Sequence, residues 1–308
     1  MGIKNTNLCF KCKKISPDNK FYGLHRRCFT EWFGCTKDDR LIAVTPEEVK
    51  KHEADALGFE EITSSFFQGK YKKYSATLGN SKYILKVKEE DYPLLQRFEY
   101  LSNEIVSYFS LPVATFYLID FENYDCFVSK NFLFEGNYRK LTHIYHFLKN
   151  QRSYTVENLV HVIFDTTHRP QDIETFLLLL LVDSLIGNND RHGRNLGFLS
   201  KGSTHVLAPL YDNCTYLGIE TLLGADINPL GKIATKETKN PSMRDYGKEL
   251  IRLGYQKILK RFYRRCTIKE ITRIISASLL PQKAQEAYIR LITKRYQEFI
   301  TFYESLNL

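Results

Sequence analysis

The sequence of 308 residues lacks features that mark several common protein classes. It has no GxxxxGKS or GxxxxGKT motif, which excludes the phosphate-cradling loop of P-loop nucleotide hydrolases. Its longest apolar run, Phe176–Val182, stops at Asp183; this is too short for a membrane span and predicts a buried helix. Its 16 Gly and 9 Pro form no low-complexity tract or internal repeat, so we expect no long linker.

The seven cysteines occur in a chain whose start, MGIKNTNLCFKCKK, has no apolar signal region. We therefore expect a cytoplasmic protein with reduced thiols rather than a disulfide framework. Cys9 and Cys12 form a CxxC pair, and His25 and Cys28 form an HxxC pair, so together they predict a tetrahedral Cys₃His site for Zn²⁺. Cys35 is an alternative fourth ligand to His25. The alternative without metal is a group of reduced surface thiols.

The composition, with 43% hydrophobic and 26% charged residues, is that of an ordinary globular protein. The net charge of +9 is unevenly spread, because residues 244–308 carry 14 Lys and Arg against 6 Asp and Glu, and residues 1–40 carry 9 against 4. Cations interleaved with aromatic residues, as in KILKRFYRRC, are able to contact nucleic acid, an anionic membrane or an acidic partner. A solvated helix face is the more common explanation, so direct nucleic-acid binding is not favoured.

Hydrophobic periodicity divides the chain into a β-rich part and a helical part, which predicts the α+β class. Residues 82–88 are typical of a strand, and residues 113–137 are typical of two strands around a turn. Beyond about residue 135 the spacing of apolar residues predicts helices, the first of them over residues 141–149. The predicted domains are a Cys/His-rich module over residues 1–40, a small mixed lobe over residues 41–135 and a helical lobe over residues 136–308.

The run GNNDRHGRN, residues 187–195, concentrates polar side chains directly after the longest apolar stretch. Asp190 and Asn195 stand five positions apart, as do the catalytic Asp and the metal-binding Asn of the protein-kinase loop HRDxxxxN. One loop is then able to place a carboxylate beside an attacking hydroxyl and an amide oxygen on Mg²⁺. Asp212, which lies 17 residues after Asn195 in an apolar context, is a candidate second Mg²⁺ ligand. The alternative is a polar loop that ends a helix and has no catalytic role.

The order Asp190, Arg191, His192 differs from the His-Arg-Asp of ordinary protein kinases and resembles the HipA-like serine/threonine kinases. The resemblance covers roughly residues 60–280 and is most specific over residues 183–213. It implies a two-lobed protein-kinase-like fold, with a small β-rich lobe and a larger helical lobe, in the short HipT-like form of the family. It also implies that Asp190 is the catalytic base, that His192 helps to place the phosphates, and that Asn195 and Asp212 hold Mg²⁺.

The same resemblance implies which side chains of the small lobe hold ATP. The family pattern of an aliphatic pair followed by Lys selects Lys86 as the residue that orients the phosphates, although Lys82 and Lys88 share its strand face. Glu104 lies on a predicted helix and resembles the glutamate that pairs with this lysine in kinases. A solvated glutamate on an amphipathic helix is the alternative.

Residues 63–79 precede the Lys86 strand and take the place of the phosphate-covering loop. Gly69 and Lys73, four positions apart, match the arrangement in HipA-like kinases and, with Ser65, are the predicted ATP contacts of this segment. Members of the family phosphorylate themselves on a serine of this loop, which implies autophosphorylation at Ser64 or Ser65. A polar hairpin without a ligand is the alternative.

The resemblance further implies partners and leaves two alternatives open. HipA-like kinases are bacterial toxins that use ATP to phosphorylate aminoacyl-tRNA synthetases and bind a DNA-binding antitoxin, so we expect ATP, Mg²⁺, a protein substrate and an antitoxin partner. One alternative is a phosphatidylinositol-type lipid kinase, which shares the DRHxxN string but continues with Phe-Gly where Asn213 and Cys214 stand here. The other is a catalytically degenerate kinase-fold interaction protein. The joint presence of four residues disfavours it: Lys86, Asp190, Asn195 and Asp212.

Overall fold

The computed structural model of the protein describes residues 8–15, 21–44, 73–87, 91–136, 138, 140–150, 154–218 and 230–306. The chain divides into two compact units. Unit 1 comprises Met1–Tyr100 and Ala114–Asn137, and unit 2 comprises Leu101–Val113 and Tyr138–Leu308. The division falls inside helix α4, Leu95–Tyr108, so this helix contributes residues to both units.

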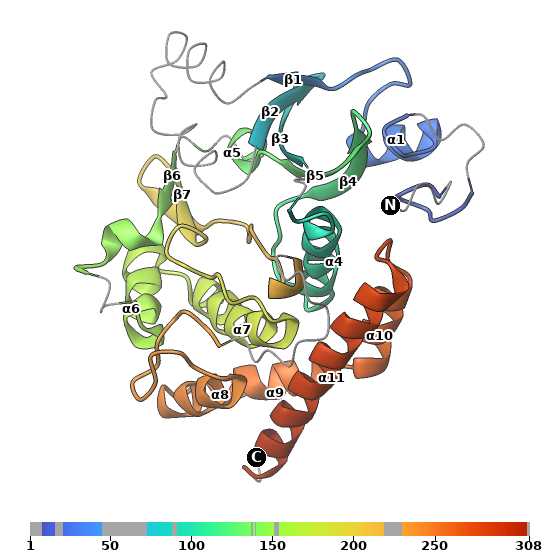
Figure 1. The fold of residues 1–308 in the computed structure, drawn as a ribbon. Coiled ribbons are helices and arrows are strands. Elements are labelled where there is room, and N and C mark those ends of the chain that lie inside the picture. Colours follow the sequence, from blue (N-terminus) through green and yellow to red (C-terminus); the bar gives the residue numbers. More distant parts are fainter. Residues whose placement is uncertain are drawn as a thin grey trace. The chain divides into compact units, whose positions relative to one another are not determined.

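Unit 1 is built on a five-stranded antiparallel sheet (Figure 1). Its strands are arranged in the order β1-β2-β3-β5-β4. Their bounds are β1 Ile42–Val44, β2 Lys73–Leu78, β3 Ser81–Val87, β4 Phe116–Phe121 and β5 Tyr124–Lys130. The predictions of a strand over residues 82–88 and of two strands within residues 113–137 are therefore confirmed, to within one residue for the first.

Turn residues with a left-handed backbone connect the strands of this sheet. Gly79, with φ of +55°, lies in the turn between β2 and β3, where a glycine accepts this conformation without strain. Glu122 and Asn123, with φ of +53° and +68°, form the two-residue turn between β4 and β5. The turn is fixed further because the backbone N–H of Asn123 donates to Asp120 Oδ1 at 2.9 Å.

Two helices of unit 1 flank the strands of this sheet in the sequence: one precedes β1 and the other follows β5. Helix α1, Arg26–Phe33, buries its aromatic residues, and Phe33 packs against Tyr117 of β4 with ring centroids 4.4 Å apart. Gly34 ends the helix in a left-handed conformation. The single-turn helix α5, Phe132–Glu135, is capped by the side chain of Asn131.

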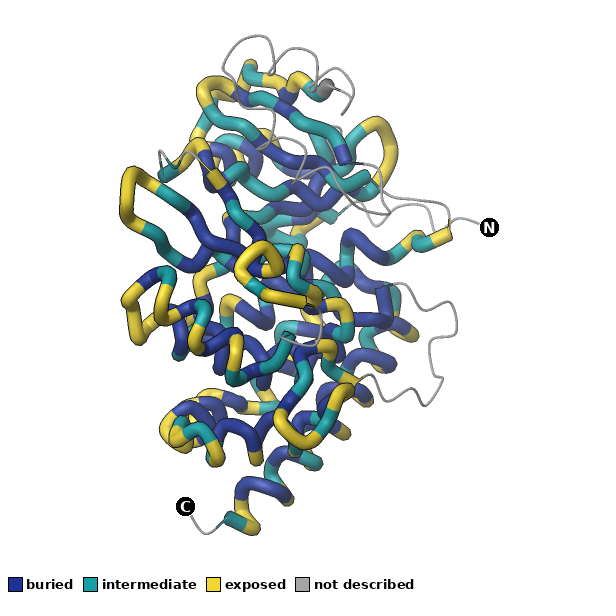
Figure 2. The backbone as a smooth tube through the Cα atoms, turned by 90° about the vertical axis from the view of Figure 1, so that its left-hand side faces the viewer, coloured by how far each residue is buried: buried dark blue, intermediate teal, exposed yellow. Residues whose placement is uncertain are grey.

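Unit 2 is mainly helical. Its helices are α6 Val156–Thr167, α7 Pro170–Ile186, α8 Met243–Arg252, α9 Gln256–Arg265, α10 Ile268–Ser276 and α11 Gln282–Glu304. Helix α7 starts with Pro170 at its first turn, and almost every residue from Ile173 to Ile186 is buried, as its continuous apolar sequence predicts. Figure 2 shows buried segments in dark blue along the helices, with exposed residues concentrated in the connections.

Unit 2 also contains a small antiparallel sheet that the sequence did not predict. Its strands, in the order β6-β7-β8, are β6 Lys140–His143, β7 Gly197–Lys201 and β8 Thr204–Leu207. The prediction of a helix over residues 141–149 is wrong, because this segment forms β6 and then the 3₁₀ turn η1, Ile144–Phe147. Pairing with β7 satisfies the backbone of β6, and this long-range partner is invisible in local periodicity.

No helix in the described part of the chain has both the length and the apolar character needed to cross a membrane.

Candidate active site

The candidate active-site loop begins where α7 ends. Gly187 ends the helix with φ of +71°, and a Cβ there would lie 2.8 Å from Leu291 Cδ2, so this position requires glycine. The segment that follows, residues 187–195, is called the DRH loop below. Asn188 fixes its first turn, because its backbone N–H donates to the Asp183 carbonyl at 2.8 Å and its side-chain Nδ2 donates to Asp183 Oδ1 at 2.9 Å.

Arg191 is the buried centre of the DRH loop. Its guanidinium binds Asp183 with two hydrogen bonds, Nε to Oδ2 at 2.8 Å and Nη2 to Oδ1 at 3.0 Å. Its Nη1 donates to the backbone carbonyls of Asn195, at 3.1 Å, and Tyr211, at 2.9 Å. Burial opposes the charge of Arg191, but the Asp183 carboxylate more than offsets this and raises the pKa of the guanidinium. One buried cation therefore ties the DRH loop to α7 and to the segment that precedes Asp212.

Asp190 and His192 flank Arg191 and face the opposite way, into solvent. The side chain of Asp190 is 70% exposed and that of His192 is 47% exposed, with His192 Nε2 3.9 Å from Asp190 Oδ2. The backbone carbonyl of Asp190 accepts from the N–H of His192 at 2.8 Å, so the turn itself is fixed while the carboxylate is accessible. Such a carboxylate is able to accept a proton from an incoming hydroxyl.

Asn195 closes the loop and is buried. Its side-chain Nδ2 donates to the Asp190 carbonyl at 2.9 Å, which directs the amide oxygen away from that bond and makes it the atom that could bind a cation. Its backbone N–H donates to the His192 carbonyl at 2.9 Å. The structure thus brings together the three DRH-loop residues that the sequence selected.

Gly193 lies where the loop passes close to Tyr145. A Cβ at Gly193 would lie 2.8 Å from Tyr145 Cβ, so a larger residue would displace the loop. Two further tyrosines bind the loop backbone: the hydroxyl of Tyr154 donates to the Arg191 carbonyl at 3.0 Å, and that of Tyr211 donates to the Arg194 carbonyl at 2.9 Å. Burial raises the pKa of both phenols, so they stay neutral donors.

Asp212 lies in the segment that Arg191 holds beside the DRH loop. Its backbone is left-handed, with φ of +52°, a conformation that non-glycine residues seldom adopt. The next residue, Asn213, is fully buried between Arg191 and α4, since its Oδ1 accepts from Arg191 and its Nδ2 donates to Asn103 Oδ1 at 2.9 Å. Tyr211 and Asn213, the residues on either side of Asp212, are thus both held by hydrogen bonds, and together they fix the backbone that carries the Asp212 carboxylate.

His143 lies close to the same segment. Its Nδ1 is 3.2 Å from the hydroxyl of Tyr211, and its ring stacks on Tyr145 with centroids 6.0 Å apart. Burial, together with the positive charges of His146 and Arg194, lowers the pKa of His143 to about 4. The imidazole is therefore neutral at physiological pH.

Lys86 belongs to unit 1, where it lies on β3. Its Nζ donates to Glu99 Oε1 at 2.5 Å, and the side chains are 14% and 4% exposed. Lys73, on β2, is directly opposite Lys86 in the antiparallel register, so both lysines project from the same face of the sheet. The predicted pairing of Lys86 with Glu104, which belongs to unit 2, stays a prediction.

Three residues predicted for the phosphate-covering loop, Ser64, Ser65 and Gly69, lie outside the described residues. Their roles stay predictions. Lys73 is the part of that arrangement that the structure describes, and it is buried in β2.

The Cys/His cluster of unit 1 gathers the four residues that the sequence selected for zinc. One ligand atom each from Cys9, Cys12, His25 and Cys28 lies within 4.8 Å of every other. Cys12 Sγ is 3.3 Å and Cys28 Sγ is 3.7 Å from His25 Nδ1. These separations allow a single ion to contact all four, and three sulfurs with one imidazole nitrogen are ligands that Zn²⁺ prefers. Cys35, the alternative ligand, is not part of the cluster.

Backbone groups around the cluster favour a thiolate. Burial opposes the charged form of Cys9, but the nearby backbone N–H groups of Cys12, His25 and Lys11 stabilise it and lower the pKa of the thiol to about 7. The N–H of His25, for example, donates to Cys9 Sγ at 3.4 Å. Burial, with the neighbouring sulfurs of Cys9 and Cys12, raises the pKa of Cys28 to about 12.

Four residues of these sites carry structural roles that the sequence did not assign: Asp183, Arg191, Asn213 and Glu99. A charged residue that interrupts an apolar helix needs a buried partner, and this is the signal that could have identified the Asp183–Arg191 pair. Glu99 gave a similar signal in the sequence, since it stands between Phe98 and Tyr100, and the structure shows that it is buried.

Comparison with known proteins places these observations in a family. The sequence model of the HipA-like C-terminal domain matches residues 62–277. Comparison with curated proteins gave no match.

Two solved structures share the fold at low sequence identity. The Helicobacter pylori proinflammatory kinase CtkA is 20% identical, with a TM-score of 0.63, over 76% of this chain and 91% of that chain. HipA of Shewanella oneidensis MR-1, from the toxin–antitoxin complex of HipA, HipB and operator DNA, is 14% identical, with a TM-score of 0.56, over 88% of this chain and 74% of that chain. The predicted α+β protein-kinase-like fold is confirmed. Since the matched domain covers well over half of the chain, the protein belongs to the HipA-like kinase family.

Proposed function

We propose that the protein is an ATP-dependent serine/threonine protein kinase of the HipA-like toxin type. The observation that carries this proposal is the geometry of the DRH loop. Its buried Arg191 is paired with Asp183, the neighbouring Asp190 carboxylate is exposed, and the side chain of Asn195 binds the Asp190 carbonyl. A loop without catalytic use would not need a buried ion pair to fix an exposed carboxylate.

The proposed roles follow from accessibility and donor type. Asp190 accepts the proton of the substrate hydroxyl, because its carboxylate is exposed and its backbone is held. Asn195 and Asp212 contribute oxygen ligands, which Mg²⁺ prefers, from two segments that share hydrogen bonds to Arg191. Bound Mg²⁺ would offset the negative charge of the ATP phosphates during transfer. His192 lies on the solvent side of the loop and is suited to contact a phosphate.

Within unit 1, Lys86 supplies the cation for ATP. Its pairing with Glu99 inside the sheet unit restricts the position of the ammonium group. Lys73, on the same face, adds a second positive charge, and Ser65 and Gly69 complete the proposed phosphate contacts. The proposed domains are residues 1–40 as the Cys/His module, residues 41–135 as the small lobe and residues 136–308 as the helical lobe.

The proposed substrate is a protein hydroxyl, with an aminoacyl-tRNA synthetase as the candidate that the family suggests, and the proposed partner is an antitoxin. HipA of Shewanella oneidensis, whose solved complex contains HipB, supports the antitoxin proposal. Incubation of the protein with γ-labelled ATP and a cell lysate, followed by identification of the labelled bands, tests the substrate. Labelling of lipid but not protein would instead support the lipid-kinase alternative.

Autophosphorylation at Ser64 or Ser65 is the proposed form of self-control. A phosphoryl group there would add about two negative charges in the predicted phosphate-covering segment and would oppose ATP binding. Mass spectrometry of wild-type protein and of the Asp190→Asn variant tests this. Phosphate on Ser64 or Ser65 only in the wild type supports autophosphorylation, whereas absence from both contradicts it.

The Cys9, Cys12, His25 and Cys28 cluster is proposed to hold one structural Zn²⁺. The ligand distances and the ligand types support this assignment. The ion would join the two loop cysteines to the start of α1 and thereby stabilise this part of unit 1.

A further inference from the structure

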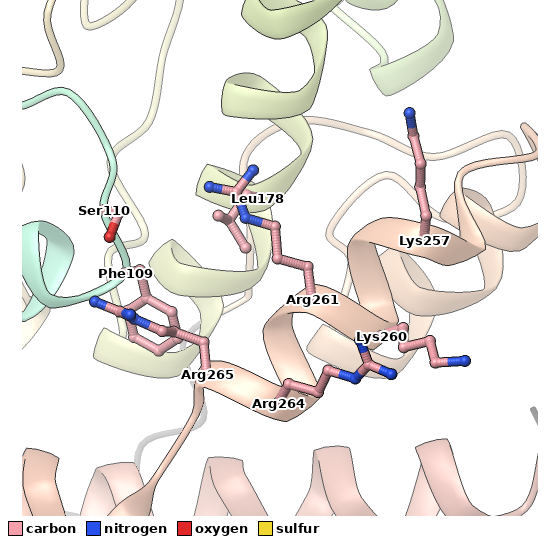
Figure 3. A pocket seen from close by; sticks show the side chains of 8 residues that line it. All are labelled: Phe109, Ser110, Leu178, Lys257, Lys260, Arg261, Arg264 and Arg265. Carbon is pink, nitrogen blue, oxygen red and sulfur yellow. The ribbon is translucent and has the colours of Figure 1, made fainter.

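Unit 2 contains a pocket that is separate from the DRH loop. Its volume is about 480 Å³, within the range of small-molecule sites. The residues that line it are Phe109, Ser110, Leu178, Lys257, Lys260, Arg261, Arg264 and Arg265 (Figure 3). Five of the eight are cations, and all five come from α9. None of the residues of the DRH loop lines this pocket.

The five cations occupy one face of α9. Lys257, Lys260, Arg261, Arg264 and Arg265 follow the spacing of residues that share a helix face, while the opposite face buries its apolar residues in the core. Like charges three and four residues apart destabilise a helix, so this arrangement has a cost in the isolated protein. A bound anion would remove that cost.

The protein supplies little negative charge to this face. Glu174 of α7 binds Lys257 at 2.5 Å and lies 3.9 Å from Arg261 Nη1. Across the described ranges of the chain, no carboxylate lies within ion-pair distance of Lys260 or Arg264. Among the residues that the structure describes, the five cations have one carboxylate, Glu174, within ion-pair distance, which leaves a strong local excess of positive charge.

The bottom of the pocket is apolar and buried. Phe109 and Leu178 are each 1% exposed, and Phe109 stacks on Phe262 of α9 with ring centroids 5.2 Å apart. Figure 3 shows the side chain of Arg261 extending toward Leu178 and that of Arg265 extending toward Phe109 and Ser110. Arg265 is itself held in place, because its Nε donates to the Tyr108 carbonyl at 2.8 Å. The hydroxyl of the exposed Ser110 adds a polar group at the edge.

We propose that this pocket binds a small molecule through a chain of linked phosphate groups, as in inorganic polyphosphate or a nucleoside polyphosphate. Arginine presents a planar set of donors that matches phosphate oxygens, and three of the five cations are arginines. From Lys257 to Arg265 the helix rises about 12 Å, a length that suits several linked phosphates better than a single one.

A hollow of this volume favours a small ligand over a macromolecule. Electrostatic binding to a nucleic-acid backbone or an anionic membrane requires an extended positive surface but does not require a cavity. Here the cations line a hollow with an apolar base, and Arg261 and Arg265 extend over that base (Figure 3).

Calorimetric titration with inorganic tripolyphosphate and with orthophosphate, in EDTA at low ionic strength, tests the proposal. Tripolyphosphate should bind to a single site per chain, as one pocket implies, and orthophosphate should bind much more weakly. The test variant is Lys260→Gln with Arg264→Gln, since both side chains are exposed and outside the ion pairs of α9. The matched control is Lys283→Gln with Arg290→Gln, two exposed cations of α11 that do not line the pocket.

The pocket variant should bind tripolyphosphate at least tenfold more weakly, and the control should bind it as the wild type does. Repeating the titration with a nucleoside triphosphate shows whether the nucleoside adds affinity that depends on the same two side chains. The thermal unfolding temperature of the pocket variant should equal or slightly exceed that of the wild type, because two like charges are removed from α9.

Three results would overturn the proposal. The first is no detectable tripolyphosphate binding. The second is an equal loss of affinity in the pocket variant and the α11 control, which would reveal a diffuse charge effect. The third is tight binding of single-stranded RNA or of vesicles of anionic lipid that depends on Lys260 and Arg264 while tripolyphosphate binding does not.

Discussion

Arg191 and Asp183 form a buried ion pair with two hydrogen bonds, at 2.8 Å and 3.0 Å, that joins the DRH loop to the last turn of α7. The side chains are 3% and 6% exposed. Asp190, one residue before Arg191, takes its position from this pair. The pair therefore connects the stability of unit 2 with the geometry of the proposed active site.

The Asp183→Ala variant should lose stability, because it leaves the Arg191 cation buried without its partner. Loss of one member of a buried pair costs about 3–5 kcal/mol, whereas loss of an exposed pair costs under about 1 kcal/mol. Glu174→Gln is the matched control, since it breaks the Lys257 pair on the same helix, whose lysine is 66% exposed. Urea unfolding measures both. Similar free energies of unfolding for the two variants would contradict the structural role of the buried pair.

The Lys86→Met variant should lose phosphoryl transfer and bind ATP more weakly, because it removes the proposed phosphate contact. It also removes the Lys86 ion pair of the buried Glu99, so a moderate loss of stability should accompany the effect. Lys82→Met is the control, because Lys82 lies on the same strand face but contacts the ring of Phe134, with Nζ 4.2 Å from its centroid. Steady-state kinetics with ATP distinguishes them. An equal loss of kcat/KM in both variants would contradict the assignment of Lys86, rather than Lys82, as the lysine that contacts the ATP phosphates.

His143 should make the folded state less stable as the pH falls. Its pKa is about 4 in the folded protein, below the ordinary histidine value of 6.5, so between these values the unfolded chain binds the proton more readily. Stability should therefore be complete above about pH 6.5 and decline toward pH 4, by at most roughly 1.4 kcal/mol per pH unit. Thermal unfolding of the wild type and His143→Gln across this interval measures the difference. Parallel pH profiles would show that His143 does not contribute.

The protein should contain about one equivalent of zinc by elemental analysis, as one closed site implies. Cys28→Ser should lose the metal, because it removes one of the four clustered ligands, whereas Cys35→Ser should retain it. Chelation should raise the protease sensitivity of the first 40 residues while unit 2 stays folded. Less than a tenth of an equivalent after metal-replete expression, or zinc loss in Cys35→Ser but not in His25→Ala, would reject this ligand set.

The sequence predicted those parts of the fold and site whose signal is local. The strand of Lys86, the apolar helix before the DRH loop and the CxxC and HxxC pairs each depend on residues close together in the chain, and the structure contains the strand, the helix and the clustered ligands. The α+β class followed from where strand-like periodicity gives way to helical periodicity.

Long-range pairing explains what the sequence could not predict. Residues 140–143 form a strand because β7, more than fifty residues later, offers a hydrogen-bonding partner. Arg191 likewise depends on carbonyls and side chains from separate segments, including Tyr211 and Asn213. Such partners are brought together only by folding, so the residues that support the DRH loop emerged from the structure.

The most direct test of the proposed kinase mechanism is the rate of phosphate transfer from γ-labelled ATP to protein by the wild type and by Asp190→Asn, with ATP affinity measured on the same preparations. Asp165→Asn, an exposed aspartate of α6, is the matched control. We predict that Asp190→Asn lowers the rate by about 10²–10⁴-fold with ATP affinity preserved, because only the proton-accepting carboxylate is lost. Transfer by Asp190→Asn at the rate of the wild type and of Asp165→Asn would contradict the mechanism.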